Sequence, residues 1–160
     1  DAVQAEIDAK KAEEAVEQAE QTKDQADVDA AEALVEKLPE GEKKDELEKR
    51  LEKVQDEIDA AARAKALEEA TAAVEKAERT FKEEDYNTAK TLVDALDDSE
   101  AKTALENRLK DVKDAIEAEK AVVVAETEKT QATVDTAREL VNALKDSEKK
   151  TELTNRLDAV

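Results

Sequence analysis

Apolar residues recur along this chain at the spacing of an α-helix. Residues 12–19 place alanine and valine at intervals of three, one and three, and residues 28–38 repeat this kind of stripe with valine, alanine and leucine. Residues 47–58 carry leucine, valine and isoleucine at intervals of four, three and four, as in a heptad seam. Because such spacings gather side chains on one helical face, the pattern predicts three successive amphipathic helices.

Two polar stretches separate these helices. The first lies around residues 24–27, where acidic or hydroxyl side chains are available as helix caps; Asp85 and Thr133 are the later equivalents. The second follows Leu38, Leu96 and Leu144 in the segments LPEGEKK, LDDSEAK and LKDSEKK. The expected N-caps of the third helices are Gly41, Ser99 and Ser147.

The three-helix pattern occurs three times. Residues 16–54, 74–112 and 122–160 align without a gap, with matching valines, alanines and leucines throughout. An arginine also recurs in each copy, at Arg50, Arg108 and Arg156. The opening segment DAVQAEIDA matches EKVQDEIDA at 52–60. The chain is therefore predicted to be a piece of a tandem array of helical repeats.

The spacers between the repeats differ in length but contain neither glycine nor proline. We therefore expect the third helix of one repeat to continue into the first helix of the next, over about 42–80 and about 100–129. The predicted fold is all-α, with tandem three-helix bundles in an elongated, spectrin-like arrangement. The predicted division is a tail of a preceding repeat at 1–9, then repeats at 10–60, 61–118 and 119–160, the last truncated at its C-terminal helix.

Composition supports helices and excludes several functions. A net charge of −19 and few bulky apolar residues are typical of disordered chains, but one Gly, one Pro and abundant helix formers favour helix. Without His or Cys the chain lacks the usual general base, thiol nucleophile and zinc ligands, so we predict no enzyme, catalytic residue, cofactor or metal site. The acidic charge disfavours nucleic acid, and no apolar run is long enough for membrane insertion.

Several groups invite a binding role. The acidic pairs and triplets at 83–85 and 97–98 do not match a calcium loop and are expected to be solvated helix ends. The two aromatics, Phe81 and Tyr86, bracket a turn, and we expect them to fill a corner of the core rather than to anchor a ligand.

Two further features are expected to be structural. Among the three β-branched residues Val122, Val123 and Val124, at least one must leave the core face, and packing between repeats is the favoured role over a partner patch. The repeated arginine is expected to extend over the second helix and form a surface ion pair, rather than to recognise a ligand. No partner-binding residue is identified.

The segments ALVEKLPEGEKKDELEKRLEKV, TLVDALDDSEAKTALENRLKDV and ALVNALKDSEKKTELTNRLDAV share the motif LV-x2-L, a turn, then K-x2-L-x2-RL-x2-V. This motif resembles tandem helical repeat modules of Gram-positive bacterial surface proteins, which are similar to a small helical domain in the C-terminal region of insecticidal crystal toxins. The resemblance implies an extracellular, cell-surface protein, associated with the cell wall or S-layer. It implies no catalytic residue, and the receptor-binding and pore-forming segments of the toxins have no counterpart here.

The predicted function is a non-catalytic stalk or spacer that holds a functional domain away from the cell. Its partners would be neighbouring repeats and domains of the same parent chain, and the fragment would be a monomer. The alternative is an adhesive module that binds a host or matrix protein, an unidentified protein ligand, through an exposed apolar face repeated in every copy. A third option is a coiled-coil oligomeriser, but the breaks near 24–27 and 39–41 favour folding within one chain.

Overall fold

The computed structural model describes residues 2–160 of the chain, and all regular structure in this range is helical. Thus the predicted fold class is confirmed as all-α. Asp1, the first residue of the predicted tail 1–9, lies outside the described residues. The described residues form seven helices: α1 (Ala2–Thr22), α2 (Gln25–Val35), α3 (Glu42–Thr80), α4 (Glu83–Asp94), α5 (Glu100–Glu128), α6 (Gln131–Ala143) and α7 (Glu148–Asp158).

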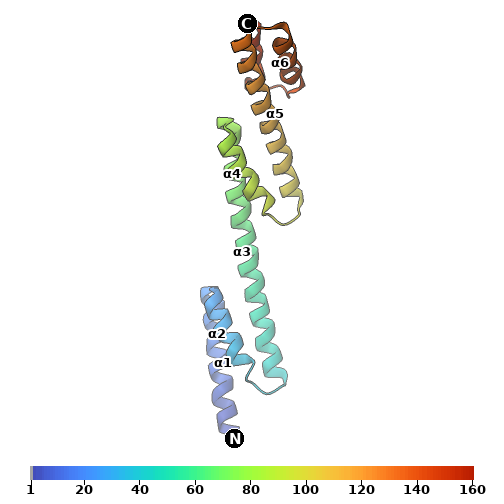
Figure 1. Ribbon diagram of the computed structural model, residues 1–160. Helices are drawn as coiled ribbons and strands as arrows, with labels where there is room; N and C mark the ends of the chain where they lie inside the picture. The colour runs from blue at the N-terminus through green and yellow to red at the C-terminus, as the bar shows by residue number, and fades with distance from the viewer. Residues whose placement is uncertain (1) are drawn as a thin grey trace. The chain divides into compact units, whose positions relative to one another are not determined.

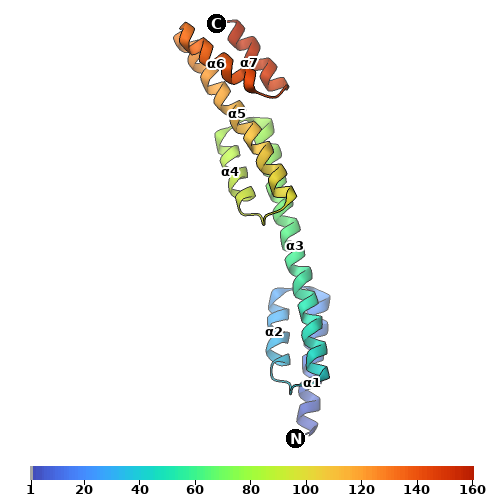
Figure 2. The ribbon, with the colours of Figure 1, turned by 90° about the vertical axis from the view of Figure 1, so that its right-hand side faces the viewer.

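The chain divides into two compact units, Asp1–Ala64 and Lys65–Val160. In the first unit, α1 and α2 lie beside the N-terminal part of α3 (Figures 1 and 2). Their facing alanines, valines and leucines form one hydrophobic core, in which Val16, Val28 and Leu47 are fully buried. Leu38, expected within the second helix, follows the end of α2 in a turn but is still buried in this core.

The second unit contains two hydrophobic cores. One is built from the C-terminal part of α3, α4 and the N-terminal part of α5, around Val74, Val93 and Leu105. The other is built from the rest of α5 with α6 and α7, around Val122 and Leu153. Alanine occupies many of the buried positions in both cores, which allows the helices to approach closely.

Both long helices match the predicted continuous segments. α3 spans Glu42–Thr80 against the expected 42–80, and α5 spans Glu100–Glu128 against the expected 100–129. Spacers rich in alanine, glutamate and lysine continue the helix because nothing in them interrupts the backbone hydrogen bonds. The division into repeats 10–60, 61–118 and 119–160 stays a prediction.

The capping predictions are partly right. Ser99 and Ser147 are N-caps, accepting hydrogen bonds from the backbone N–H of Lys102 and Lys150 at 3.1 Å. Gly41 directly precedes α3, and its carbonyl accepts a hydrogen bond from the Asp45 N–H. Asp24, within the predicted stretch 24–27, is the N-cap of α2, and its side chain accepts a hydrogen bond from the Ala26 N–H. The N-caps of α4 and α6 are Lys82 and Thr130, three residues before the predicted positions.

Two predicted caps are therefore wrong. α4 begins at Glu83, so Asp85 lies inside the first helical turn rather than at its cap. α6 begins at Gln131, so Thr133 donates its backbone N–H to the Thr130 hydroxyl that caps the helix. In both cases the following helix begins sooner than the polar composition suggests, because a single left-handed residue reverses the chain.

That residue is not glycine in any of the three turns. Lys23, Phe81 and Lys129 occupy equivalent positions after α1, α3 and α5, and their φ angles are 50°, 49° and 50°. Each donates its backbone N–H to the carbonyl four residues earlier, at Ala19, Ala77 and Ala125. This is the left-handed C-cap for which glycine is the usual residue, so each turn carries backbone strain.

Candidate functional site

Each repeated arginine forms a bidentate ion pair with a glutamate on another helix. The Nε and Nη2 atoms of Arg50 on α3 donate to the two carboxylate oxygens of Glu20 on α1, at 2.8 and 2.7 Å. Arg108 binds Glu78 at 2.8 and 2.7 Å, and Arg156 binds Glu126 at 2.9 and 2.8 Å. The predicted ion pair is confirmed, but each arginine binds the first helix of its repeat rather than extending over the second helix.

These pairs are half-buried and electrostatically coupled. The Arg50 side chain is 26% exposed and that of Glu20 is 38% exposed. The hydrogen bonds from Arg50 hold the pKa of Glu20 below its usual value, and those from Arg156 lower the pKa of Glu126. Reciprocally, the carboxylates raise the pKa values of all three arginines. Bidentate geometry fixes the register of the two helices as well as pairing their charges.

The third ion pair, between Arg156 and Glu126, is part of a larger network of charged side chains. Arg156 also donates to Glu119 at 3.2 Å, and Glu119 binds the ammonium of Lys149 at 3.0 Å. The Lys149 side chain is only 12% exposed, and its Nζ lies 5.5 Å from the centroid of the Phe81 ring. This network therefore connects α5 and α7 to the turn after α3, all within the second unit.

Phe81 and Tyr86 have the structural roles predicted for them. Phe81 is partly buried and packs against both hydrophobic cores of the second unit, whereas Tyr86 packs against one of them. A groove of about 290 Å³ lies next to Phe81 and is lined by charged residues such as Lys145 and Lys149. Lys145 is paired with Asp111 at 2.6 Å and Lys149 with Glu119, so these cations are neutralised within the chain.

A repeated lysine binds a carbonyl oxygen of the turn before the third helix in two of the three copies. Lys102 donates to the carbonyl oxygen of Leu96 at 2.9 Å, and Lys150 donates to that of Leu144 at 2.8 Å. Their equivalent in the first repeat, Lys44, instead binds Glu40 at 2.7 Å. The aligned column was visible in the sequence, but its role depends on how the chain folds back at the turn.

One acidic side chain that was expected to be solvated at a helix end is buried. Glu83 and Glu84 are exposed, but Asp85 is buried and accepts hydrogen bonds from Lys76 and Thr80, both at 2.7 Å. The bond from Lys76, followed by that from Thr80, lowers the pKa of Asp85. Across residues 2–160, no group of three or more acidic side chains is arranged to hold a metal ion. Nor does this range include a helix long and apolar enough to cross a membrane.

The prediction that at least one of the three valines leaves the core face is confirmed, but the packing role favoured for them is wrong for two. Val122 is fully buried, but Val123 is 47% and Val124 is 43% exposed, so neither serves packing between repeats. The face of α5 that packs against this core is made of alanines and Val122. Three consecutive residues of an α-helix point in different directions, so they cannot all lie on that face. Val3 and Ile7 on α1 are also exposed, although the equivalent residues in α3 and α5 pack against hydrophobic cores.

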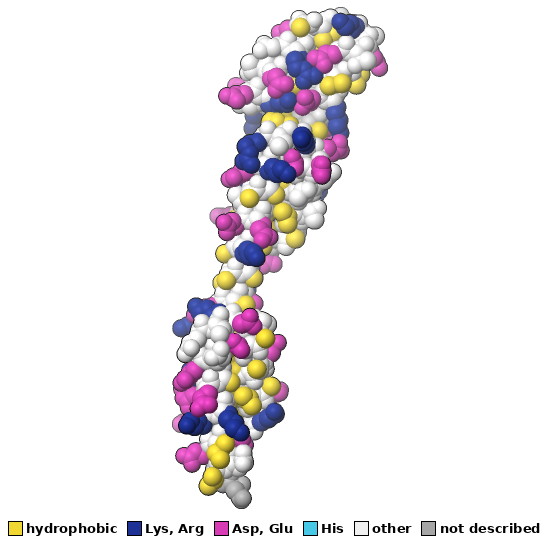
Figure 3. Space-filling model, turned by 90° about the vertical axis from the view of Figure 1, so that its left-hand side faces the viewer, with side chains coloured by type: hydrophobic (Ala, Val, Ile, Leu, Met, Phe, Trp, Pro, Cys, Tyr) yellow, Lys and Arg dark blue, Asp and Glu magenta, His cyan; other side chains and the backbone are white. Residues whose placement is uncertain are grey.

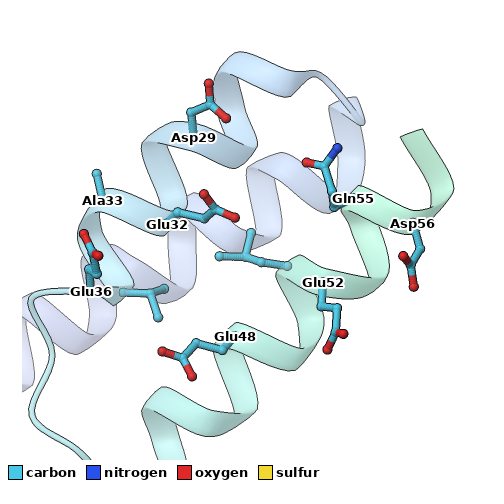
Figure 4. A pocket seen from close by; sticks show the side chains of 10 residues that line it. Asp29, Glu32, Ala33, Glu36, Glu48, Glu52, Gln55 and Asp56 are labelled. Atoms are coloured by element: carbon cyan, nitrogen blue, oxygen red, sulfur yellow. The ribbon is translucent and has the colours of Figure 1, made fainter. Parts of the chain in front are cut away.

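A groove of about 580 Å³ runs between α2 and α3 in the first unit, and Figure 4 shows the side chains that line it. Val35 and Leu51 form its floor, and Ala33 lies exposed at its side. No lysine or arginine lines it. Its other lining residues are six carboxylates and one amide: Asp29, Glu32, Glu36, Glu48, Glu52, Asp56 and Gln55.

Comparisons with protein-family models, curated proteins and solved structures find no match to this chain.

Proposed function

We propose that this chain is a segment of a stalk that holds a functional domain away from a cell surface. In this proposal the chain is an array of three-helix modules in which the third helix of each module continues as the first helix of the next. The observation that supports it is that each long helix contributes side chains to two hydrophobic cores. α3 supplies Leu47 to the first core and Val74 to the second, and α5 supplies Leu105 to the second and Val122 to the third.

Helix length is the physical basis of a spacer. An α-helix rises about 1.5 Å per residue, so the 39 residues of α3 extend over about 60 Å. Sharing a helix makes each junction as stiff as the helix itself, and the spacer length then sets both reach and rotation between modules. A row of such modules would resist collapse better than domains joined by flexible coil.

The surface of the chain supports a spacer more than an adhesive module. Charged side chains of both signs are spread over the face drawn in Figure 3, and the net charge of −19 opposes self-association. An adhesive array would expose the same apolar face in each repeat. The large exposed apolar residues of the described chain do not recur at equivalent positions: Val3, Ile7, Val123, Val124 and Leu140.

The location rests on the resemblance to Gram-positive surface repeats. On that basis the parent protein would be extracellular and attached to the cell wall or S-layer. The segment would act as a monomer whose partners are the neighbouring repeats and domains of its own chain. No enzymatic role is part of this proposal.

Small-angle X-ray scattering with light scattering tests the proposal. A monomeric rod on the order of 100 Å long is expected if helices α3 and α5 join the modules end to end. A compact domain of this length would instead have a radius of gyration of about 15 Å. A compact monomer, or an oligomer at micromolar concentration, would rule out the stalk as formulated here.

A further inference from the structure

We propose that the exposed face of α1 around Val3 and Ile7 is a docking surface for the turn between the first and second helices of a further module. This inference rests on the proposed stalk, because the partner is another module of the same array. Val3 is 69% and Ile7 is 44% exposed, and a separation of four residues places them on the same side of α1. The docking surface consists of four exposed residues: Val3, Gln4, Glu6 and Ile7.

The first repeat shows what covers such a face. The segment DAVQAEIDA of α1 matches EKVQDEIDA of α3, so Val3 corresponds to Val54 and Ile7 to Ile58. Val54 is only 4% exposed, and Ile58 packs against the hydrophobic core that α1 and α2 build with α3. The two equivalent residues of the second repeat are 2% and 7% exposed in their own core: Val112 and Ile116. The apolar part of the docking surface therefore has the residues that two other helices bury against a helix pair.

Gln4 has the same local geometry as a glutamine that contacts the turn of the first repeat. Gln55, its equivalent, exchanges two hydrogen bonds with Gln25 at the start of α2, at 2.8 and 2.9 Å. Gln55 also donates to Asp59 at 2.9 Å, and Gln4 donates in the same way to Asp8 at 2.8 Å. Because an amide NH2 group has two hydrogens, Gln4 keeps one N–H and its carbonyl oxygen for a glutamine of the partner.

The charge of Glu6 identifies the residue expected in the partner's turn. Glu57, its equivalent, binds the ammonium of Lys23 in the left-handed turn after α1 at 2.7 Å. In the second repeat these two positions hold Ala115 and Phe81, which pack in the same hydrophobic core. The turn residue is thus matched to the third helix, with lysine opposite glutamate and phenylalanine opposite alanine. Glu6 therefore predicts a lysine in the turn that covers the docking surface.

The turn between α5 and α6 has the composition that the docking surface requires. Lys129 occupies its left-handed position and Gln131 follows two residues later, as Lys23 and Gln25 do in the first repeat. Both side chains are exposed, and Gln131 donates to Asp135 of its own helix at 2.8 Å, which leaves its second N–H for a partner. A module with this kind of turn would bury the two apolar residues of the docking surface and pair both polar ones.

The test uses a cysteine as a reporter of burial, because the chain has none of its own. A tandem protein joins residues 1–157 to a complete second copy of the chain; residues 1–3 have the same sequence, DAV, as residues 158–160. In the single chain, the thiol of Ile7→Cys should react with N-ethylmaleimide at the rate of an exposed thiol. In the second copy of the tandem protein it should react at least about tenfold more slowly, because the α5–α6 turn of the first copy covers it.

Two matched variants calibrate the reaction rates. Ile116→Cys in the single chain gives the rate of a covered thiol, since Ile116 is 7% exposed. Val124→Cys gives the rate of an uncovered one, since Val124 is 43% exposed, close to the 44% of Ile7. In the second copy of the tandem protein, the Val124→Cys thiol should react within about twofold of its rate in the single chain. Equal rates for the Ile7→Cys thiol in the single and tandem proteins would overturn the proposal.

A charge reversal tests the identity of the partner. Lys129→Glu in the first copy places two carboxylates together and should speed the reaction of the Ile7→Cys thiol about two- to fivefold. Adding Glu6→Lys in the second copy should restore the slow rate. A failure of this restoration would overturn the pairing of Glu6 with the turn lysine.

X-ray scattering of the same tandem protein reports on the stalk separately. A rod in which the Ile7→Cys thiol reacts fast would refute the docking surface and leave the stalk proposal intact. A compact monomer in which this thiol reacts slowly would refute the stalk and retain the contact between modules.

Discussion

The ammonium of Lys149 lies 5.5 Å from the centre of the Phe81 ring, although the two residues come from different repeats of the sequence. Phe81 reaches this position because it occupies the left-handed turn after α3, where the equivalent residues are Lys23 and Lys129. One aromatic side chain at a turn thus packs against both hydrophobic cores of the second unit.

Replacing Phe81 with lysine should weaken the second unit. The variant Phe81→Lys keeps the type of residue found in the other two turns but removes the ring from both cores. We expect a loss of about 1–3 kcal/mol in the free energy of unfolding, from lost apolar burial and the lost cation–π contact. Urea unfolding followed by circular dichroism measures it. Lys149→Met separates the two contributions, and an unchanged midpoint for Phe81→Lys would contradict the role given to the ring.

Replacing Lys129 with glycine should stabilise the chain. Lys129 has φ 50° and an exposed side chain, so the substitution relieves left-handed strain without removing a core contact. The expected gain is about 0.5–1 kcal/mol, the strain relieved minus the extra backbone entropy of glycine in the unfolded state. Lys129→Ala is the matched control, because alanine keeps the strain. A denaturation midpoint for the glycine variant at or below that of alanine would show that the turn is unstrained.

Removing the Glu20 carboxylate should make the first unit less sensitive to acid. Its pKa is depressed by Arg50, so its contribution to stability is present above its ordinary value of 4.5 and is lost as pH falls through the lower folded value. Glu20→Gln should cost about 0.5 kcal/mol at pH 7, since the pair is partly exposed, and nothing at pH 2. Urea midpoints between pH 7 and pH 2 test this. Glu17→Gln removes an exposed carboxylate from the same helix and serves as the matched control.

Several elements follow directly from the sequence. The core positions are predictable because alanine, valine and leucine recur at helical spacing in three aligned copies, and most of them are buried. The continuity of α3 and α5 is predictable because the spacers contain no helix breaker. Ser99 and Ser147 are predictable as caps because serine is rare in this chain and stands directly before an acidic first turn.

Other features depend on tertiary structure. The turn residues Lys23, Phe81 and Lys129 carry no local signal for a positive φ, since glycine or asparagine would be expected there. The partners of the arginines lie 30 residues away, a separation set by the whole path of the chain through two turns. The acidic groove of the first unit is visible only when α2 and α3 are placed side by side.

Truncating one leucine in each core should have similar effects. Leu51, Leu109 and Leu157 are aligned in the sequence and at most 4% exposed. Each Leu→Ala variant should lose about 2–5 kcal/mol, from lost burial and the cavity left behind. Thermal melts of the three variants provide the measurement. If the cores are coupled through shared helices, each variant should lower the melting temperature of the entire chain. Independent loss of one fraction of the signal would show that the cores unfold separately.

The middle of α3 should be the weakest part of that helix. Every residue from 60 to 66 is exposed, so this segment has no core contact and depends on the high helix propensity of its alanines. Ala62→Gly should weaken the local helix by about 1 kcal/mol, and Ala62→Pro by about 3 kcal/mol. Hydrogen exchange of the backbone amides near 60–68 should accelerate in that order, while the amides of Leu47 and Val74 keep their protection. Faster exchange at those buried positions would mean that the stability of both cores depends on the exposed segment. α3 would then unfold as a single cooperative element, and its two ends would not be stable independently.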